Sequence, residues 1–320
     1  MPENQTANDE PVASAWSSVF QAGLGIFLLV GAGFMAHYYA PPETASLQAE
    51  VSQLTSQVQE LQQAQSMPTL VLNRYRDSIC YVFGIYQVGF PGRPPALRAR
   101  ISGTGFVVSD GLLATNRHVA QPWYGDTEAA ALINRGAIPV LEKLLVFFPG
   151  RPSPVDVTPL VVSAQGDLAV LKIEDAGGKK FRPLPLAEQA STPGELVTVV
   201  GYPMGVLGMV AKSPPAVYER LAFRRDDQGS ANELAALSLI RPSATCGHLG
   251  DVVGDKLVYD APTAHGGSGG PVFNAHGQVI GINSAYIDGF SGGTLGVSVD
   301  ALRPLIASAK KKLKTAVAQN

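Results

Sequence analysis

The sequence predicts an all-β domain, a barrel or a sandwich, preceded by a membrane-spanning helix and a short coiled-coil stalk. Three observations predict it: an almost unbroken apolar run at residues 16–40, a heptad pattern at residues 43–65, and short apolar stretches between turn residues over residues 70–310. Hydrophobic periodicity distinguishes spanning helices, coiled coils and strands in this way. With 320 residues, 46% of them hydrophobic and 16% charged, the chain is long enough to bury a sizeable core.

Residues 1–15 are polar and acidic, which is typical of a disordered tail. Residues 16–40 provide the roughly 20 apolar residues that a helix needs to cross a bilayer. Trp16 at one edge and Tyr38 and Tyr39 at the other lie where interfacial aromatic belts are found. A cleaved signal peptide is the competing interpretation, but no Lys or Arg precedes the run and no small-residue cleavage site follows it. We therefore expect a single-pass anchor, whose orientation the distant basic residues do not indicate.

A stalk is predicted after Pro41 and Pro42, which end the membrane helix. Apolar residues then recur at alternating spacings of four and three, as the a and d positions of a heptad do: Leu47, Val51, Leu54, Val58 and Leu61. Residues 43–65 are too short for a stable isolated coiled coil, but the anchor raises their local concentration, so we expect a homo-oligomer through this segment. A short amphipathic helix packed on its own domain is the alternative. Residues 66–68 are expected to end the stalk.

The rest of the chain alternates short Val-, Ile-, Leu- and Phe-rich stretches with Gly, Pro, Asn and Asp, which favours an all-β barrel or sandwich. Two stretches look helical, residues 126–134 and an insertion near residues 215–238, and a C-terminal helix is expected from its N-cap at Asp300. Examples of the expected strands are residues 78–88, 105–109, 112–115, 144–148, 167–173, 196–201, 257–259, 271–273, 278–283 and 294–298.

The composition argues against several kinds of partner. A net charge of −2 leaves no electrostatic footprint for nucleic acid. The lysines near the C-terminus fit the last turns of a helix, where cations are favourable. We expect no cofactor and no metal. Cys80 and Cys246 match no metal-ligand spacing, and the sequence leaves open whether they form a disulfide.

The chemistry centres on Gly266-Gly267-Ser268-Gly269-Gly270, which a β-rich run follows at once. Glycine permits positive φ and close approach of the backbone to a ligand. A serine on such a turn exposes its Oγ and leaves nearby N–H groups free to receive an anionic oxygen, as acyl transfer requires. Taken alone, a Gly-rich hairpin turn with an incidental serine explains the stretch equally well.

A serine nucleophile needs a base, and the base needs an orienting acceptor. Of the other histidines, His37 lies at the membrane edge, His265 shares the tight loop of Ser268, and His276 fits a solvated turn. His118 instead follows a strand, an Asp-Gly hairpin and a second strand, and a histidine at the end of a strand can face a cleft from a rigid support.

Asp167 is the candidate orienting acid. It opens a strand whose other residues are nearly all apolar, and a carboxylate leading a buried strand needs a partner such as an imidazole N–H. Asp156 is the reserve candidate, although its proline-rich surroundings resemble a loop.

Gly266-x-Ser268-x-Gly270 also satisfies the nucleophile-elbow pattern of α/β-hydrolases. Those enzymes need a helix after the serine and the chain order Ser, acid, His. Here Pro271 and a strand follow, and no acid lies between Ser268 and the only later histidine, His276. This excludes the elbow interpretation.

Three motifs in the order His, Asp, Ser resemble the trypsin-like serine proteases, most closely their bacterial HtrA/Deg branch. They are Thr104-Gly-Phe-Val-Val with Ala114-Thr-Asn-Arg-His118-Val, then Asp167-Leu-Ala-Val-Leu-Lys-Ile, and then Asp260-Ala with Gly266-Gly-Ser268-Gly-Gly-Pro-Val and Val279-Ile-Gly-Ile-Asn283. The resemblance covers roughly residues 70–306. It implies a trypsin-like double β-barrel with the active site in the cleft between the barrels.

The resemblance also implies roles for individual residues. His118 would be the general base and acid, Asp167 its orienter and Ser268 the nucleophile of a serine endopeptidase. The loop of Gly266, Gly267 and Ser268 would form the oxyanion hole, with the N–H groups of Gly266 and Ser268 as donors and Gly267 shaping the turn. Two segments would contact the substrate, as the pocket wall and the substrate-pairing strand: Pro262, Thr263 and Ala264, and Gly281, Ile282 and Asn283.

The chain departs from the family pattern in several ways. Gly267 stands where relatives usually carry Asn, which suggests a more mobile oxyanion loop and excludes activation by a new N-terminus paired with an Asp there. No acidic residue lies at the expected pocket floor, so we expect a small to medium apolar side chain before the cut rather than Arg or Lys. The usual PDZ domain is not expected. The resemblance places the protease domain in the periplasm, anchored in the bacterial inner membrane.

Two other functions are open. A non-catalytic peptide-binding scaffold on a protease fold is one, although the presence of all three triad residues argues against it. An enzyme held latent until a partner orders the loop at Gly267 is the other.

Overall fold

The computed structural model describes residues 27–35, 42–174, 181–286 and 293–318, and the chain divides into two compact units, Met1–Gln62 and Gln63–Asn320. Residues 27–35 of the first unit are helical. Within the described part of the chain, no helix combines the length and the apolar character needed to cross a membrane. The expected tail and most of the predicted spanning segment lie outside the described residues.

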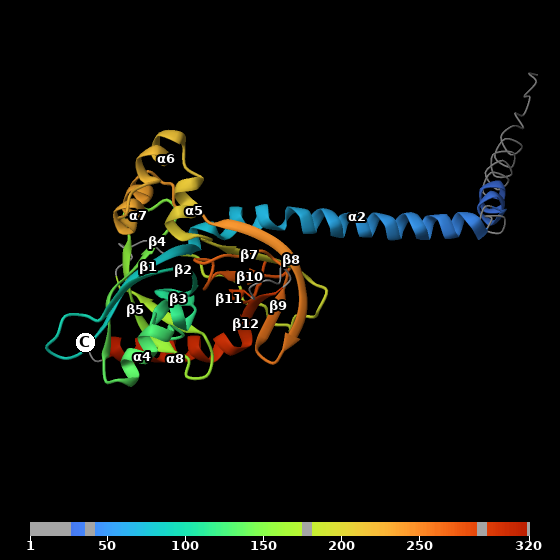
Figure 1. Ribbon diagram of the computed structural model, residues 1–320. Coiled ribbons are helices and arrows are strands. Elements are labelled where there is room, and N and C mark those ends of the chain that lie inside the picture. The colour runs from blue at the N-terminus through green and yellow to red at the C-terminus, as the bar shows by residue number, and fades with distance from the viewer. Residues whose placement is uncertain (1–26, 36–41, 175–180, 287–292, 319–320) are drawn as a thin grey trace, which may run out of the picture. The chain divides into compact units, whose positions relative to one another are not determined.

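The helix α2 (Pro42–Tyr75) begins in the first unit and ends in the second (Figure 1). Its proline stands at the first helical position, where the missing N–H has no partner to lose. Along the part that belongs to the first unit, the heptad side chains are between 49% and 67% exposed. The predicted stalk is therefore helical, and its apolar stripe is uncovered within the described chain.

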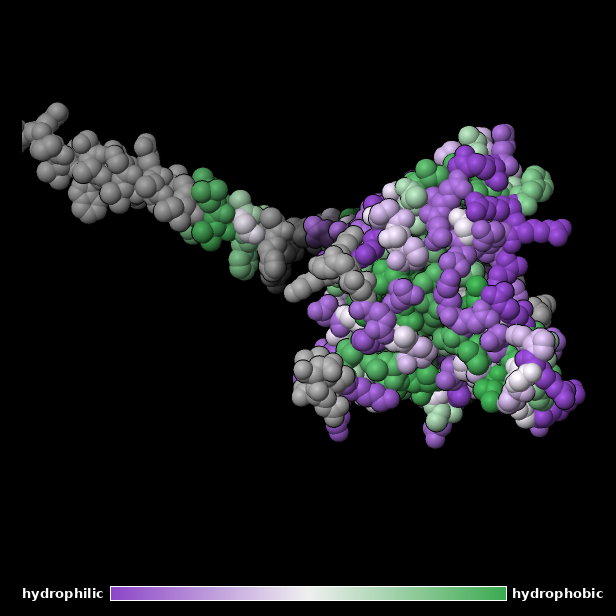
Figure 2. All heavy atoms as spheres, turned by 90° about the vertical axis from the view of Figure 1, so that its left-hand side faces the viewer, coloured by the Kyte–Doolittle hydropathy of each residue, from purple (hydrophilic) through white to green (hydrophobic). Residues whose placement is uncertain are grey.

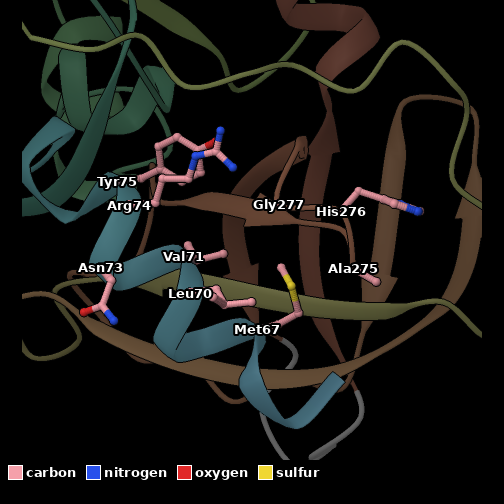
Figure 3. Close-up of a pocket in the computed structure, with 9 residues that line it drawn as sticks. All are labelled: Met67, Leu70, Val71, Asn73, Arg74, Tyr75, Ala275, His276 and Gly277. Atoms are coloured by element: carbon pink, nitrogen blue, oxygen red, sulfur yellow. The ribbon is translucent and has the colours of Figure 1, made fainter. Parts of the chain in front are cut away.

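The helix does not end at residues 66–68, where the stalk was expected to end, because α2 passes through Pro68 and continues to Tyr75. A proline inside a helix costs about 3 kcal/mol. Met67, directly before this proline, and Val71 and Tyr75 after it are at most 4% exposed. Burying each large apolar side chain contributes roughly 1.5–3 kcal/mol, which offsets that cost. Figure 3 shows these turns of the helix beside the turn at Ala275–Gly277.

The second unit contains two closed six-stranded barrels (Figure 1). Neighbouring strands in both barrels pair antiparallel. The first barrel closes in the order β1 (Ile79–Gly89), β2 (Leu97–Ser109), β3 (Leu112–Thr115), β6 (Ala169–Ile173), β5 (Val155–Val162) and β4 (Ile138–Phe147). The second closes in the order β10 (Pro271–Phe273), β11 (Val279–Tyr286), β12 (Thr294–Ser298), β9 (Lys256–Tyr259), β8 (Ser243–Val253) and β7 (Leu196–Gly201).

Each barrel has an apolar interior of its own, and a larger apolar cluster lies between them. This shared cluster joins aromatic residues of both barrels, among them Tyr81 and Tyr202, whose ring centroids lie 5.8 Å apart. The hydroxyl of Tyr202 also donates to the carbonyl of Ile79 at 2.9 Å. Apolar packing and a buried hydrogen bond thus fix the two barrels against each other, so loops from both can build one site.

The helices that follow α2 lie outside the barrel strands in three regions of the second unit. The turns η1 (Arg76–Ser78) and α3 (Arg117–Ala120) and the helix α4 (Thr127–Asn134) belong to the first barrel, and Asp126 caps α4 as its Oδ1 accepts from the N–H of Ala129. The helical insertion between β7 and β8 consists of α5 (Gly205–Ala211), α6 (Pro215–Leu221) and α7 (Asp227–Ala236). The long α8 (Val299–Ala318) contacts strands of both barrels.

The insertion stands at the top of the unit in Figure 1, and Figure 2 shows hydrophobic residues reaching the surface among hydrophilic ones on the neighbouring face. Its most exposed apolar side chain is Phe223 on the turn after α6. Both cysteines are free: Cys80 is buried in the first barrel and Cys246 lies on β8 of the second. The disulfide that the sequence left open is therefore not formed.

Candidate active site

His118 lies on the single turn α3, directly after β3. Two contacts join it to Asp167: its backbone N–H donates to Oδ1 at 2.9 Å, and its ring Nδ1 lies 2.8 Å from Oδ2. Asn116 supports the same junction, since its Nδ2 donates to the carbonyl of Asp167 at 2.8 Å. The carboxylate therefore sets both the position of the His118 backbone and the orientation of its ring.

Asp167 stands just before β6 and leaves 21% of its side chain exposed. Burial by itself would raise its pKa, but the hydrogen bonds and charge of His118 and the hydroxyl of Ser284 outweigh it and hold the pKa below the ordinary value. The group is thus an ionised acceptor suited to orienting an imidazole. Asp156, the reserve candidate, is exposed on β5, so it is not the acid of this site.

Ser284 is a site residue that sequence reasoning missed. Its Oγ donates to Oδ2 of Asp167 at 2.5 Å, and its carbonyl accepts from Oγ of Ser268 at 2.8 Å. The sequence offered a signal, because this serine directly follows Asn283 in a segment already assigned to the substrate. No local sequence pattern, however, indicates that the hydroxyl of Ser284 contacts Asp167 while its carbonyl contacts Ser268.

Ser268 is brought to the boundary of the barrels by Thr104 on β2. The N–H of Thr104 donates to the carbonyl of Ser268 at 2.8 Å, and its Oγ1 donates to the carbonyl of Gly266 at 2.7 Å. Thr104 is fully buried, and its Oγ1 also accepts from the N–H of Tyr202 at 3.0 Å. His118, Asp167 and Ser268 thus lie in one network through Ser284. Among the described residues, no hydrogen bond joins Ser268 directly to His118.

Two glycines of the loop have positive φ, +90° at Gly266 and +88° at Gly269. A Cβ at Gly269 would lie 2.0 Å from the carbonyl oxygen of Thr104, and one at Gly266 would lie 2.5 Å from that of Tyr202. No side chain fits at either position, so the Gly-rich run is explained by the loop conformation and by contact with both barrels.

The N–H groups of the loop fall into two sets. Those of Gly267, Gly269 and Gly270 donate to backbone carbonyls of the protein. Within the described part of the chain, no group accepts a hydrogen bond from the N–H of Gly266 or of Ser268. The N–H of Gly267 donates to the carbonyl of Ala264 at 2.9 Å, so this residue shapes the turn.

The carbonyl of His265 is bound by the N–H of Met204 at 2.6 Å. In a trans peptide the C=O and the following N–H point in opposite directions. This contact therefore directs the N–H of Gly266 away from Met204. Met204 begins the insertion with a φ of +61°, unusual for a residue with a side chain, so the backbone is strained where it supports the loop.

The segments predicted to contact substrate have different surroundings. Pro262 is exposed and its carbonyl accepts from Oγ1 of Thr245. Thr263 and Ala264 are half-buried: Oγ1 of Thr263 accepts from the side chain of Asn283, and the carbonyl of Ala264 accepts from the N–H of Gly267. The structure corrects the expectation for 281–283. On one side, Gly281 and Ile282 pair with β10 and Asn283 bonds to the loop before it; on the other side, all three pair with β12. This segment therefore has no free edge for a substrate strand.

His276, one of the other histidines weighed from the sequence, lies away from the site. His276 is exposed on the turn after β10, and the ring points away from α2 in Figure 3. His37 lies outside the described residues. In the described part of the chain, no cluster of His, Cys, Asp and Glu has the composition of a metal site.

Known proteins resemble this chain in sequence and in structure. A family described as trypsin-like peptidase domain matches residues 103–282. A probable periplasmic serine endoprotease DegP-like of Rhizobium meliloti is 31% identical over 204 residues, 63% of this chain and 31% of that protein. Serine protease HTRA1 of Xenopus laevis is 25% identical over 219 residues, 67% of this chain and 37% of that protein, so the chain matches only a minor part of these relatives. A solved serine endoprotease from Yersinia pestis is similar with a TM-score of 0.48 at 18% identity, covering 75% of this chain and 65% of that one.

Proposed function

The chain belongs to the trypsin-like peptidase family, and on that premise we propose that it is a serine endopeptidase of the HtrA branch that acts through an acyl-enzyme. His118 is the general base and acid, Asp167 orients it, and Ser268 is the nucleophile. The observation that carries the proposal is the 2.8 Å contact between Nδ1 of His118 and Oδ2 of Asp167. With Nδ1–H donated to the carboxylate, the neutral ring keeps its lone pair on Nε2, where it can accept a proton from a serine.

The reaction follows from these positions. Oγ of Ser268 attacks the scissile carbonyl carbon while Nε2 of His118 takes the hydroxyl proton, and the carbonyl π electrons move onto the oxygen. The N–H groups of Gly266 and Ser268, which have no acceptor in the described protein, are suited to bind that oxyanion. The C–N bond then breaks as His118 returns the proton to the leaving amine. Water attacks the resulting ester by the same sequence and restores the hydroxyl of Ser268.

The hydrogen bond of the Ser268 hydroxyl bears on how the nucleophile is activated. The hydroxyl of Ser268 donates to the carbonyl of Ser284 at 2.8 Å, so it must turn toward His118 before it reacts. Giving up this hydrogen bond costs about 1 kcal/mol, a cost that substrate binding can offset. The same contact favours the second candidate, a latent enzyme in which a partner drives the turn. A non-catalytic scaffold is the remaining alternative.

Labelling with a fluorophosphonate probe tests the function. We expect the full-length chain in detergent micelles to be labelled and the Ser268→Ala variant to remain unlabelled. Labelling that appears only after a partner is added supports the latent enzyme. A folded chain that no condition renders labelled, and that hydrolyses no protein substrate, would support the scaffold instead.

We also propose that residues 16–40 anchor the chain in the bacterial inner membrane and that residues 43–65 assemble it into a homo-oligomer. The apolar run supports the anchor, and the exposed heptad stripe of α2 supports the oligomer. The name of the Rhizobium meliloti relative supports a periplasmic protease domain. Protease treatment of intact and permeabilised cells tests the side. We expect degradation of the domain once the outer membrane alone is opened, and protection until the inner membrane is broken would refute it.

A further inference from the structure

We infer that Asn283 is a positioning residue of the oxyanion hole, which it builds by holding the peptide unit between Gly267 and Ser268. This role rests on the proposed function and differs from the substrate contact expected from the sequence. Asn283 is 1% exposed on β11, and its side chain makes three hydrogen bonds. Oδ1 accepts from the hydroxyl of Tyr259 at 2.7 Å, and Nδ2 donates to Oγ1 of Thr263 at 3.1 Å and to the carbonyl of Gly267 at 2.9 Å.

The chemistry of the partners determines the orientation of the amide. The carbonyl of Gly267 can only accept, so the atom of Asn283 that faces it must be the NH₂ group. Oδ1 then faces Tyr259, which is fully buried and whose hydroxyl can donate to it. An apolar or acidic side chain of the same size cannot satisfy both neighbours.

The contact with Gly267 controls the nucleophile through one peptide plane. The carbonyl of Gly267 and the N–H of Ser268 belong to the same trans peptide unit and point in opposite directions. Holding the carbonyl against Nδ2 of Asn283 therefore directs the N–H of Ser268 to the other side, where no acceptor of the described protein lies. That N–H is one of the two donors assigned to the oxyanion.

The backbone of Asn283 reinforces the arrangement. Its N–H donates to the carbonyl of Gly270 and its carbonyl accepts from the N–H of Gly269, both at 2.8 Å. The loop around Ser268 is thus bound to this residue on both flanks of the nucleophile. The N–H of Gly270 also donates to the carbonyl of Gly267, at 3.1 Å, so the peptide plane retains a second support when the side chain of Asn283 is removed.

These contacts also bear on the glycine that departs from the family pattern. The expectation of a mobile loop at Gly267 conflicts with them, because its N–H and its carbonyl are both bound. A Cβ at this position would lie 2.4 Å from Oγ1 of Thr263, the other acceptor of Asn283. Gly267 leaves the space in which the side chains of Thr263 and Asn283 meet.

The test measures the rate at which a fluorophosphonate probe labels Ser268 in the full-length chain in micelles. Phosphonylation places the P=O oxygen in the hole, so it reports the donors without a known substrate. We expect Asn283→Leu to slow labelling by about 10- to 100-fold, and Asn283→Asp, which sets a carboxylate oxygen against the carbonyl of Gly267, by at least as much. The pH at which labelling is half-maximal should not move, because His118 and Asp167 are untouched.

Asn274 provides a matched control. It is half-buried and organises the turn after β10, where its Oδ1 accepts from His276 and Gln278. Asn274→Leu should lower the melting temperature and leave the labelling rate within about twofold, since among the described residues its side chain bonds only to His276 and Gln278. If Asn283→Leu does not fold, Tyr259→Phe decides the question: it removes one hydroxyl and should slow labelling by about three- to tenfold.

The outcomes separate this role from the function on which it rests. A labelled wild-type chain with a folded Asn283→Leu variant that reacts at the same rate overturns the role of Asn283 alone. Equal slowing by Asn274→Leu also overturns it, because the effect would then follow from stability. A wild-type chain that is never labelled overturns the proposed function and this role with it.

Discussion

Oγ of Ser284 donates to Oδ2 of Asp167 at 2.5 Å, the same carboxylate oxygen that lies 2.8 Å from Nδ1 of His118. The carbonyl of Ser284 also accepts from the hydroxyl of Ser268 at 2.8 Å. Ser284 belongs to the second barrel and Asp167 to the first. The position of Asp167 beside His118 therefore depends on how the two barrels pack against each other. The residue before Ser284, Asn283, bonds to Gly267, Gly269 and Gly270 of the loop that carries Ser268.

Ser284→Ala should lower kcat by about tenfold with little change in KM, because Asp167 loses a donor that holds it against His118. Peptide hydrolysis, or the labelling rate where no substrate is known, measures the effect. Ser213→Ala is the matched control, since that hydroxyl donates to the carbonyl of Met209 in the insertion. An unchanged kcat in the folded Ser284→Ala variant would show that the contact between Ser284 and Asp167 does not contribute to catalysis.

Asp167→Asn should reduce kcat by about 10⁴-fold, because an amide can turn its N–H toward His118 and select the wrong tautomer. The loss should persist when the variant is fully folded, as judged by circular dichroism at the assay temperature. Asp156→Asn, an exposed carboxylate of the same barrel, is the control and should retain activity.

The pH dependence of stability gives a separate prediction for the same residue. The pKa of Asp167 is lower in the folded protein than its ordinary value, so its ionised form stabilises the fold above the unfolded pKa of about 3.9. That contribution disappears as the pH falls through the folded pKa. The difference in melting temperature between wild type and Asp167→Asn should therefore shrink from about pH 6 to about pH 3. A constant difference across that window would contradict the assignment.

Gly269→Ala should abolish labelling and strongly destabilise the second unit. Its φ is +88°, and the new Cβ would lie 2.0 Å from the backbone oxygen of Thr104, which cannot move without displacing β2. Gly277→Ala separates strain from collision, because φ there is +71° but the nearest atoms lie 3.9 Å away or more. That variant should lose only about 1 kcal/mol of unfolding free energy and stay active. Equal stability of the two variants, measured by thermal melting, would refute the collision.

Leu54→Asn should weaken the oligomer, since it sets a polar group at a d position of the proposed coiled coil. Leu54 is 52% exposed in the single chain, so its substitution removes little packing within the chain itself. Light scattering of the full-length chain in micelles measures the mass. Ser56→Asn, at an outward position of the same helix, should leave the mass unchanged. A monomeric wild-type chain would favour the alternative of a helix packed on its own domain.

The ten strands expected from apolar stretches are all present, because each alternates with turn residues that end it. The strands β5 and β8 were not among those singled out. β5 contains Pro159 beside a bulge, and β8 contains Gly247 and Gly250, residues that propensity assigns to loops. Barrel closure supplies the partners that hold these segments extended. The helix α5 was missed for a similar reason, since Gly205 and Gly208 lower its propensity and burial of Val206 and Met209 compensates.

The sequence by itself determined which residues could carry the chemistry, because a glycine-bracketed serine, a histidine after a strand and an aspartate before one each follow from local patterns at Ser268, His118 and Asp167. Only the tertiary structure decided which way the hydroxyl of Ser268 points and that the side chain of Asn283 binds the carbonyl of Gly267. It alone also showed that Ser284 bonds to both Ser268 and Asp167. These properties depend on hydrogen bonds between segments far apart in the chain. Their distances are set by the packing of two barrels, which no local pattern of residues contains.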